Sequence, residues 1–357
     1  MNKNWSIRGY NHGDEEEINE LFNQVFSKAR TLDYWNWEFK KNPDGSKIFV
    51  AVDKDQVIAH LGSLNRKIKI GKEYCRASLE VDGMTHPNYG RQGIFVALGK
   101  KMLAESKKEG IDIIIGFPNE KAIPGHRKLH CIELFSLHVM IKPVNLKNIS
   151  KKLFSNRLLC LLSEKIGKCM FGVFYRIKKQ KIEENVTLMA ISEFDDRFDK
   201  FWEEAKSSYP IILHRDKRYM NWRYGECPGQ QYYKFVAEKE DRILAVVVAR
   251  IVERYGLSNG AIVDILSLPN HEEVVHGLLL RAIEHLKDKR VDLVACSIPK
   301  WSVYNDVLKK CGFMKCPKRL NPKEEPFIIY PLSKEISIDY VKNVNNWYIT
   351  WGDTDVV

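Results

Sequence analysis

Three features that this 357-residue sequence lacks narrow the kind of protein that it can be. Its eight cysteines include no Cys-x-x-Cys pair, and reduced thiols in a cytosolic protein are the simplest interpretation. The opening residues, Met1 to Trp5, are too polar for the apolar core of a secretory signal. No apolar run reaches the ~18–20 residues that a membrane-spanning helix needs. We therefore expect a soluble, cytoplasmic protein without a membrane span.

Acidic residues are scarce in one region. The net charge is +11, and between Lys142 and Lys181 the acid Glu164 stands alone among Lys and Arg residues. Leucines recur on one side of this stretch, which predicts one or two amphipathic helices. A solvated basic face is the simplest interpretation, while weak contact with an acidic membrane surface or with an anionic substrate stays open. Nucleic acid is not expected, because aromatic residues do not alternate with the basic ones.

One pattern is present twice in the chain. Val81 to Phe95 reads VDGMTHPNYGRQGIF, and Val263 to Val275 repeats it as VDILSLPNHEEVV. The segment YWNWEF, residues 34–39, likewise returns as YMNWRY, residues 219–224. Because the order is the same in both halves, we infer a duplicated domain. We predict one domain over residues 1–145, a basic helical segment over 146–185, and a second domain with a C-terminal tail over 186–357.

The first half is predicted to be an α+β unit. Its apolar spacing predicts a helix over 15–27, strands over 48–52, 57–64, 68–70, 75–85 and 111–116, a helix from residue 94, and a short helix beyond Pro118. This order describes a mixed, mostly antiparallel sheet with one parallel pair near its middle, flanked by helices.

The junction between the 75–85 strand and the next helix is typical of a phosphate-binding turn. Glycines there leave free backbone N–H groups at a helix N-terminus, which hold phosphate without a side chain. The second copy has Glu272 and Glu273 where the first has Gly90 and Arg91. Because carboxylates repel a diphosphate, we expect one functional cofactor site per chain.

These features resemble the GNAT acyl-CoA N-acyltransferases, in a tandem arrangement that covers nearly the whole chain. Met84-Thr85-His86-Pro87 is similar to the family's strand end, and Gly93 to the central glycine of its Arg/Gln-x-x-Gly-x-Gly/Ala turn. Gly90 and Phe95 depart from that pattern without removing a backbone donor. The resemblance implies that acetyl-CoA or another short acyl-CoA is a co-substrate, with its pantetheine arm along Met84 and Thr85. Its pyrophosphate would lie on the turn formed by Gly90, Arg91, Gln92, Gly93, Ile94 and Phe95.

A second segment, Asn119 to Cys131, resembles the family's Asn-x-x-Ala-x-x-Leu-Tyr-x-Lys-Leu-Gly-Phe motif. The resemblance implies that Asn119 bonds the pantetheine and that His126 stands where a tyrosine protonates the departing thiolate. Histidine suits that role because its ordinary pKa lies near operating pH, although a surface histidine at a helix start fits the pattern equally well. His126 and His130 share a helix face, but a third ligand is missing, so no metal is expected.

The candidate general base is a carboxylate, because an amine must be neutral to attack a thioester. Glu80 and Asp82 alternate onto one face of the strand before the turn, where either could serve. A polar face at the sheet surface is the alternative for each.

Two regions are candidates for binding the acceptor. Tyr34, Trp35 and Trp37 could stack against a sugar or base ring, although core packing is the commoner fate of such residues. The C-terminal tail combines aromatic residues with Asp353 and Asp355, which predicts that it docks, with a carboxylate that binds the substrate amine.

The predicted function is that of a monomeric, acyl-CoA-dependent N-acyltransferase. Its tandem form resembles enzymes that acylate the amine of nucleotide-linked deoxyamino sugars for surface polysaccharides. Two alternatives stay open. One is an aminoacyl-tRNA-dependent peptidoglycan-bridge ligase that uses the basic segment for RNA, and the other is a non-catalytic protein that binds CoA or another ligand.

Overall fold

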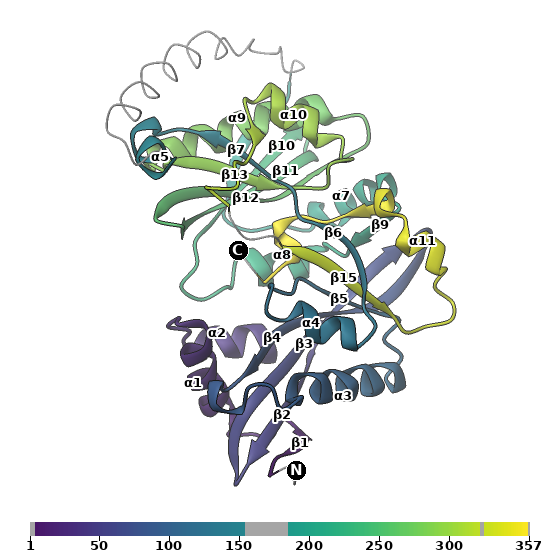
Figure 1. Ribbon diagram of the computed structural model, residues 1–357. Helices are drawn as coiled ribbons and strands as arrows, with labels where there is room; N and C mark the ends of the chain where they lie inside the picture. The colour runs from purple at the N-terminus through teal and green to yellow at the C-terminus, as the bar shows by residue number, and fades with distance from the viewer. Residues whose placement is uncertain (1–3, 154–184, 322–324, 356–357) are drawn as a thin grey trace.

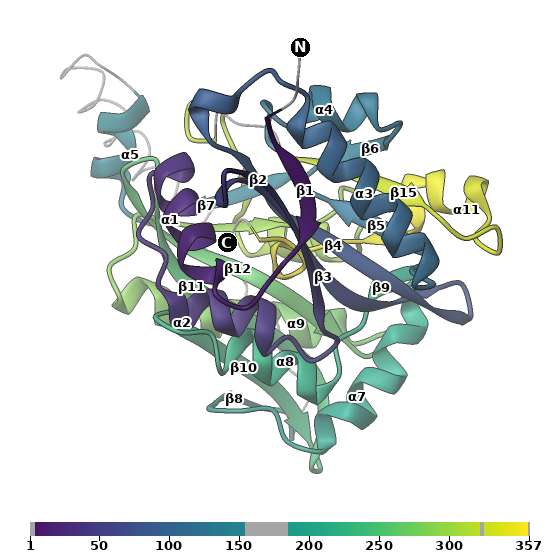
Figure 2. The ribbon, with the colours of Figure 1, turned by 90° about the horizontal axis from the view of Figure 1, so that it is seen from below.

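Two mixed sheets lie side by side, each flanked by helices (Figures 1 and 2). The structure is a computed structural model that describes residues 4–153, 185–321 and 325–355. Each sheet is mostly antiparallel and contains one parallel pair, β4 with β5 in the first and β12 with β13 in the second. The predicted α+β class with two such units is therefore confirmed.

The first sheet has the strand order β1-β2-β3-β4-β5-β15-β6. The strands are β1 (Ser6–Gly9), β2 (Ser46–Asp53), β3 (Gln56–Ile70), β4 (Glu73–Thr85), β5 (Ile113–Gly116), β15 (Pro326–Pro331) and β6 (Ile132–Ser136), and β9 (Ile211–Leu213) joins β3 to β16 (Trp347–Tyr348). The predicted break between 64 and 68 is wrong, since β3 runs through it. Arg66 made this stretch look like a polar turn, but its side chain is buried against the second half of the chain.

Helices cover both faces of the first sheet (Figure 2). On one face lie α1 (Asp14–Phe26), α2 (Leu32–Trp35) and the π-helical turn η1 (Asn36–Lys40), and on the other lie α3 (Ile94–Lys108) and α4 (Ile123–Lys128). The α1 helix buries Ile18 and Leu21, and α3 buries Leu98 and Met102. The predicted helices are thus present, because their apolar residues recur at helical spacing. A short 3-10 turn, η2 (Pro87–Tyr89), precedes α3.

The second sheet has the order β14-β7-β13-β12-β11-β10-β8. Its strands are β14 (Met314–Lys315), β7 (Val139–Pro143), β13 (Leu293–Ser297), β12 (Leu257–Ser267), β11 (Arg242–Arg254), β10 (Tyr232–Lys239) and β8 (Thr187–Ile191). The remaining described helices and turns are α5 (Leu146–Leu153), α7 (Arg197–Ala205), η3 (Lys206–Ser208), α8 (Lys217–Tyr224), α9 (Glu272–Asp288), α10 (Tyr304–Lys310), α11 (Ile338–Lys342), η4 (Val344–Asn346) and η5 (Trp351–Asp353). Most of the basic segment, residues 154–184, lies outside the described residues.

The two halves exchange strands. The β7 strand lies within the predicted first domain, 1–145, but pairs with β13 and β14 of the second sheet. The β15 strand lies within the predicted second domain, 186–357, but pairs between β5 and β6 of the first sheet. The predicted domain boundaries therefore do not coincide with the two sheets, because tertiary packing determines which strands pair. In Figure 1, yellow β15 lies beside blue β5.

The contact between the halves is nearly symmetric at Trp37 and Trp222, which are equivalent residues of the two repeats. Their rings stack with centroids 4.8 Å apart and planes inclined by 18°. The indole N–H of Trp37 donates to the carbonyl of Trp222 at 2.8 Å, and that of Trp222 donates to the carbonyl of Trp37 at 3.1 Å. Such reciprocal contacts are characteristic of a two-fold axis, so the halves pack as a pseudo-dimer.

Candidate active site

The β4 strand is irregular where the sequence places the candidate carboxylates. Its pairing with β3 shifts register between His60 and Gly62, and Asp82 has a left-handed φ of 53°. The ring nitrogen Nδ1 of buried His60 lies 2.9 Å from the carbonyl oxygen of Asp82. A β-bulge of this kind redirects side chains, and it places Asp82 at a cavity wall.

Beyond Glu80, β4 no longer pairs with β5. The parallel ladder ends at Glu80 and Gly116, whereas β4 continues to Thr85. Within the described part of the chain, no strand pairs with this edge of β4 between residues 81 and 85. The free backbone edge of Met84 and Thr85 thus fits the predicted strand-like pairing with an extended ligand.

The turn before α3 has the backbone expected of an anion site. Arg91 has a φ of 64° and Gly93, the N-cap of α3, has a φ of 79°. These left-handed residues turn the chain so that the first N–H groups of α3 point out of the helix end. Gly90, Arg91 and Gln92 are exposed, whereas Ile94 is buried and anchors the helix. The turn therefore fits a pyrophosphate.

Phe95 is accommodated by two glycines. A Cβ built on Gly125 would lie 2.4 Å from the Phe95 ring, and one on Gly83 would lie 3.0 Å from it. The Phe95 ring also meets the His126 ring edge to face, with centroids 5.1 Å apart. The bulky residue that departs from the family turn is thus part of the wall next to His126.

A cavity of about 130 Å³ brings together six of the predicted site residues. It is lined by Phe22, Phe26, Lys28, Glu80, Val81, Asp82, Gly83, Phe95, Gly116, Phe117, Pro118, Asn119, Ala122, His126 and Asp355. All three predicted catalytic residues are among them. The Asn119 side chain accepts from the backbone N–H groups of Lys121 at 2.9 Å and Ala122 at 3.1 Å, so its carbonyl oxygen shapes the turn before α4.

Glu80, His126 and Tyr330 form a buried polar chain in this cavity. Glu80 Oε1 lies 3.4 Å from His126 Nε2, and His126 Nδ1 lies 2.8 Å from the Tyr330 hydroxyl. Burial, and to a lesser extent the charge of Asp355, raises the pKa of Glu80 to about 8, while burial lowers the pKa of His126 to about 4. At neutral pH His126 is uncharged, so the reason for expecting it to be an acid, a pKa near operating pH, does not hold.

A second cavity, of about 450 Å³, is built from both halves of the chain. It is lined by Phe22, Lys28, Ala29, Arg30, Thr31, Tyr34, Glu38, Asp82, Pro228, Gly229, Gln230, Arg250, Val252 and Asp355. Phe22, Lys28, Asp82 and Asp355 line both cavities, so the two spaces meet at the Asp82 and Asp355 carboxylates.

Charges are concentrated around this junction. Arg30 forms ion pairs with Asp82 and, at 3.3 Å, with Glu38. Burial and the charge of Asp82 raise the pKa of Glu38 above its usual range. Desolvation by the surrounding protein and the charge of Asp82 also raise the pKa of Asp355, to about 6, although this side chain is exposed. Such shifted carboxyl groups are common where protons are transferred.

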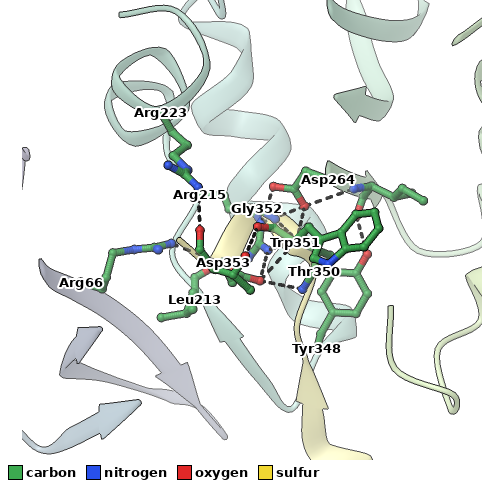
Figure 3. A network of polar contacts seen from close by, with 12 residues as sticks. Arg66, Leu213, Arg215, Arg223, Asp264, Tyr348, Thr350, Trp351, Gly352 and Asp353 are labelled. Carbon is green, nitrogen blue, oxygen red and sulfur yellow. Dashed lines mark hydrogen bonds and ion pairs between the residues drawn. The ribbon is translucent and has the colours of Figure 1, made fainter. Parts of the chain in front are cut away.

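Three predicted acceptor residues do not reach the cavities. Trp35 and Trp37 are buried, and Trp37 stacks on Trp222, so these two belong to the core and to the contact between the halves. Asp353 is buried and accepts from Arg215 at 2.6 Å, with Arg66 3.7 Å away (Figure 3). These three assignments are corrected, because packing within the first half covers Trp35 and packing between the halves covers Trp37 and Asp353.

The space that corresponds to the cavities in the second repeat is filled by the C-terminal segment. Tyr348 donates to the carbonyl of Ile265 at 2.6 Å, and Thr350 donates to Asp264 at 3.2 Å. A Cβ on Gly352 would lie 2.1 Å from the hydroxyl oxygen of Tyr224. The tail thus docks, as predicted, but chiefly in the second repeat, and Asp355 alone of its described carboxylates lines the cavities.

Comparison with known proteins identifies the first half. Residues 6–127 match the model of the acetyltransferase (GNAT) domain. The matched residues are similar to that domain, and the match covers less than half of the chain. The predicted enzyme class, an N-acyltransferase that uses an acyl-CoA co-substrate, is thereby confirmed, and the turn before α3 lies inside the matched region. Comparison with curated protein sequences gives no match.

Solved structures show that the fold likeness extends over both halves. A GCN5-related N-acetyltransferase from Anabaena variabilis has a TM-score of 0.63 at 12% identity, over 92% of this chain and 73% of that one. A probable N-acyltransferase from Enterococcus faecalis has a TM-score of 0.65 at 11% identity, over 92% and 72%. Saccharomyces cerevisiae N-myristoyltransferase with bound myristoyl-CoA has a TM-score of 0.63 at 12% identity, over 93% and 83%. At these identities the likeness is one of fold.

Neither a metal-binding cluster nor a membrane-spanning helix is found among the described residues. No group of three His, Cys, Asp or Glu residues there is placed to hold a metal ion. No helix among the described elements is both long and apolar enough to cross a membrane.

Proposed function

We propose that the enzyme transfers an acetyl or other short acyl group from acyl-CoA to the primary amine of a nucleotide-linked amino sugar. The observation that carries the proposal is the pair of cavities that meet at Asp82 and Asp355. One cavity adjoins the free edge of β4 and the turn before α3, and the other is open to a larger acceptor.

The chemistry follows from the positions of the carboxyl groups. The amine nitrogen attacks the thioester carbon, a C–N bond forms, the C–S bond breaks, and the amine loses one proton. Glu80 in its ionised form accepts that proton, directly or through water. The departing thiolate takes up a proton from the buried pair of Glu80 and His126. Neutral His126 relays the proton or orients Glu80, and Asp82 and Asp355 lie where the amine enters.

The small first cavity favours a short acyl group. Its apolar walls are aromatic, with Phe22, Phe95 and Phe117 among them, and its volume is about 130 Å³. Such a space holds few carbon atoms, so acetyl-CoA is the expected donor.

The second cavity suits an acceptor that has both an amine and anionic groups. Besides its carboxylates it has exposed Lys28 and half-buried Arg250, which would meet a diphosphate, and Tyr34, which could stack on a ring. This polarity supports a nucleotide-linked amino sugar.

Thiol release from acetyl-CoA tests the proposal. The acceptor panel contains dTDP- and UDP-linked amino sugars, free glucosamine, aminoglycosides, polyamines and peptides. Turnover with the nucleotide-linked amines at least tenfold above the others is the expected result. Activity confined to peptides or polyamines would exclude the sugar acceptor, and the absence of transfer to every amine would exclude the function.

A further inference from the structure

We propose that Glu38 belongs to the acceptor site and accepts a hydrogen bond from the amino group of the incoming acceptor. This inference rests on the proposed function, because it concerns the acceptor cavity of the same enzyme. It comes from comparing that cavity with its equivalent in the second repeat, where the chain itself supplies the occupant.

The two repeats contain equivalent ion pairs. Arg30 and Arg215 are separated by 185 positions, the same spacing as Trp37 and Trp222. Each arginine immediately precedes the residue that caps the next helix, and each forms an ion pair with the aspartate of the repeated Val-Asp motif, Arg30 with Asp82 and Arg215 with Asp264. The pseudo-two-fold contact thus relates the surroundings of one pair to those of the other.

In the second repeat the space beside the ion pair has an occupant, the turn from Thr350 to Thr354 (Figure 3). This turn presents hydrogen-bond acceptors to arginines. The Asp353 carboxylate accepts from Arg215 at 2.6 Å, and the Thr354 carbonyl accepts from Arg223 at 2.6 Å. The positive groups of the pocket therefore match a negatively charged occupant.

In the first repeat the corresponding space is the open cavity, and the charge of one of its wall residues is reversed. Arg223 corresponds to Glu38, again 185 positions apart, and Arg66 corresponds to Val252. Both Glu38 and Val252 line the cavity. An arginine only donates hydrogen bonds, whereas a glutamate carboxylate only accepts them. Arg223 donates to the Thr354 carbonyl, so an occupant of the first cavity would present a hydrogen-bond donor to ionised Glu38 where Thr354 presents an acceptor.

Glu38 can accept such a ligand. Its side chain is 6% exposed, at the wall of the cavity. The guanidinium group of Arg30, which pairs with Glu38, is 3.6 Å from the centre of the Phe22 ring, which holds it in place. The charged groups that act on Glu38 are the guanidinium groups of Arg30 and Arg223 and the carboxyl groups of Asp82 and Asp355.

The test compares Glu38→Gln with Asp33→Asn. Asp33 is an exposed carboxylate of α2, next to the η1 turn that contains Glu38, and lies outside both cavities, so its loss controls for net charge. The probes are matched pairs, UDP-glucosamine with UDP-glucose and glucosamine with glucose, and acetyl-CoA is the donor. Initial rates give the KM of each amine, the KM of acetyl-CoA and kcat.

Glu38→Gln should raise the KM of the amine roughly 10- to 100-fold, as expected for loss of a hydrogen bond to a charged group, and leave the KM of acetyl-CoA within about twofold. Asp33→Asn should change neither. Glu38→Asp, which keeps the charge, should recover part of the amine affinity, whereas a merely structural role would alter both KM values.

Two results would overturn the inference without touching the function. One is acyl transfer by Glu38→Gln with an unchanged KM for the amine. The other is a hydroxyl analogue that inhibits the enzyme with an inhibition constant equal to the KM of the corresponding amine. If no amine is acylated, thermal shifts with the same pairs still test the site. The amine should then stabilise the wild-type protein more than its hydroxyl analogue does, and an equal shift would contradict the assignment.

Discussion

At the residue scale, the candidate site depends on burial that shifts proton equilibria. Glu80 is enclosed beside uncharged His126, and no described Lys or Arg is ion-paired with its carboxylate. Burial therefore raises its pKa toward the pH at which amines lose their own protons. A base with such a pKa is partly ionised at operating pH and still basic enough to accept a proton.

Replacement of Glu80 should test this base directly. We expect Glu80→Gln to lower kcat roughly 10²- to 10⁴-fold and to leave acetyl-CoA affinity unchanged, because the carboxylate acts on the amine. In the wild type, kcat should rise with pH through a midpoint near 8, since only the ionised form is a base. Stopped-time thiol release from pH 6 to 9.5 measures the profile.

A change at Asp355 is the matched control for that profile. Removing its negative charge with Asp355→Asn should move the midpoint to lower pH, but not to the ordinary value near 4.5, because burial is the larger cause of the shift. An unchanged midpoint in Asp355→Asn, or full activity in Glu80→Gln, would contradict the assignment.

At the scale of elements, the strand–turn–helix units β4–α3 and β12–α9 have the same architecture but differ in features that affect the binding of acyl-CoA. The turn before α3 presents its N–H groups beside a free strand edge, whereas α9 begins with Glu272 and Glu273. The cleft next to β12 is in addition filled by the segment around Tyr348 and Thr350. For two independent reasons, charge and occupation, we therefore expect acyl-CoA to bind in the first repeat only.

This asymmetry predicts one acyl-CoA site per chain. Gly93→Asp should abolish binding, since it places a side chain and a negative charge at the N-terminus of α3 and at a φ of 79°. Glu272→Gly should change nothing, because the tail still fills the second cleft. Isothermal titration with acetyl-CoA measures the number of sites, and a second site in either the wild type or Glu272→Gly would refute the argument.

At the scale of the whole molecule, the halves cannot act as separate domains. Each sheet includes a strand from the other half of the sequence, and the tail binds Arg215 and Asp264 through Thr350 and Asp353. The first repeat receives Tyr330, a partner of His126, through the exchanged strand β15. The active site is therefore complete only when both halves are folded together.

We expect Asp353 to stabilise the fold and Asp355 to act in the candidate site. Asp353→Asn removes a charge that compensates buried Arg215, so we expect it to lower the unfolding free energy by roughly 3–5 kcal/mol. Asp355→Asn should lower it by less than about 1 kcal/mol, since that side chain is exposed. Urea unfolding followed by fluorescence measures both, and equal stability of the two variants would contradict this division of roles.

The sequence alone predicted features that depend on local patterns. Helical and strand spacing predicted α1, α3, β4 and β5, because apolar residues recur where these elements pack. The glycines around residues 90–93 predicted the turn, and the alternation of Glu80 and Asp82 predicted that both reach one cavity. Arg30 and Glu38 were missed although a signal existed, since Glu38 lies in the repeated segment 34–39, Arg30 lies just before it, and both are spaced by 185 from arginines, Arg215 and Arg223.

Only the tertiary structure decided the features that depend on distant partners. Tyr330 is 204 positions from His126, and no local pattern indicates that β15 pairs with β5. Trp37 and Asp353 carry groups that suit a ligand, yet packing between the halves buries both of them. Local spacing determines which residues face the same way along one element, whereas burial depends on which other elements cover that face. This is the physical reason that Glu80 and Asp82 were predictable from the sequence, whereas the burial of Trp37 and Asp353 was not.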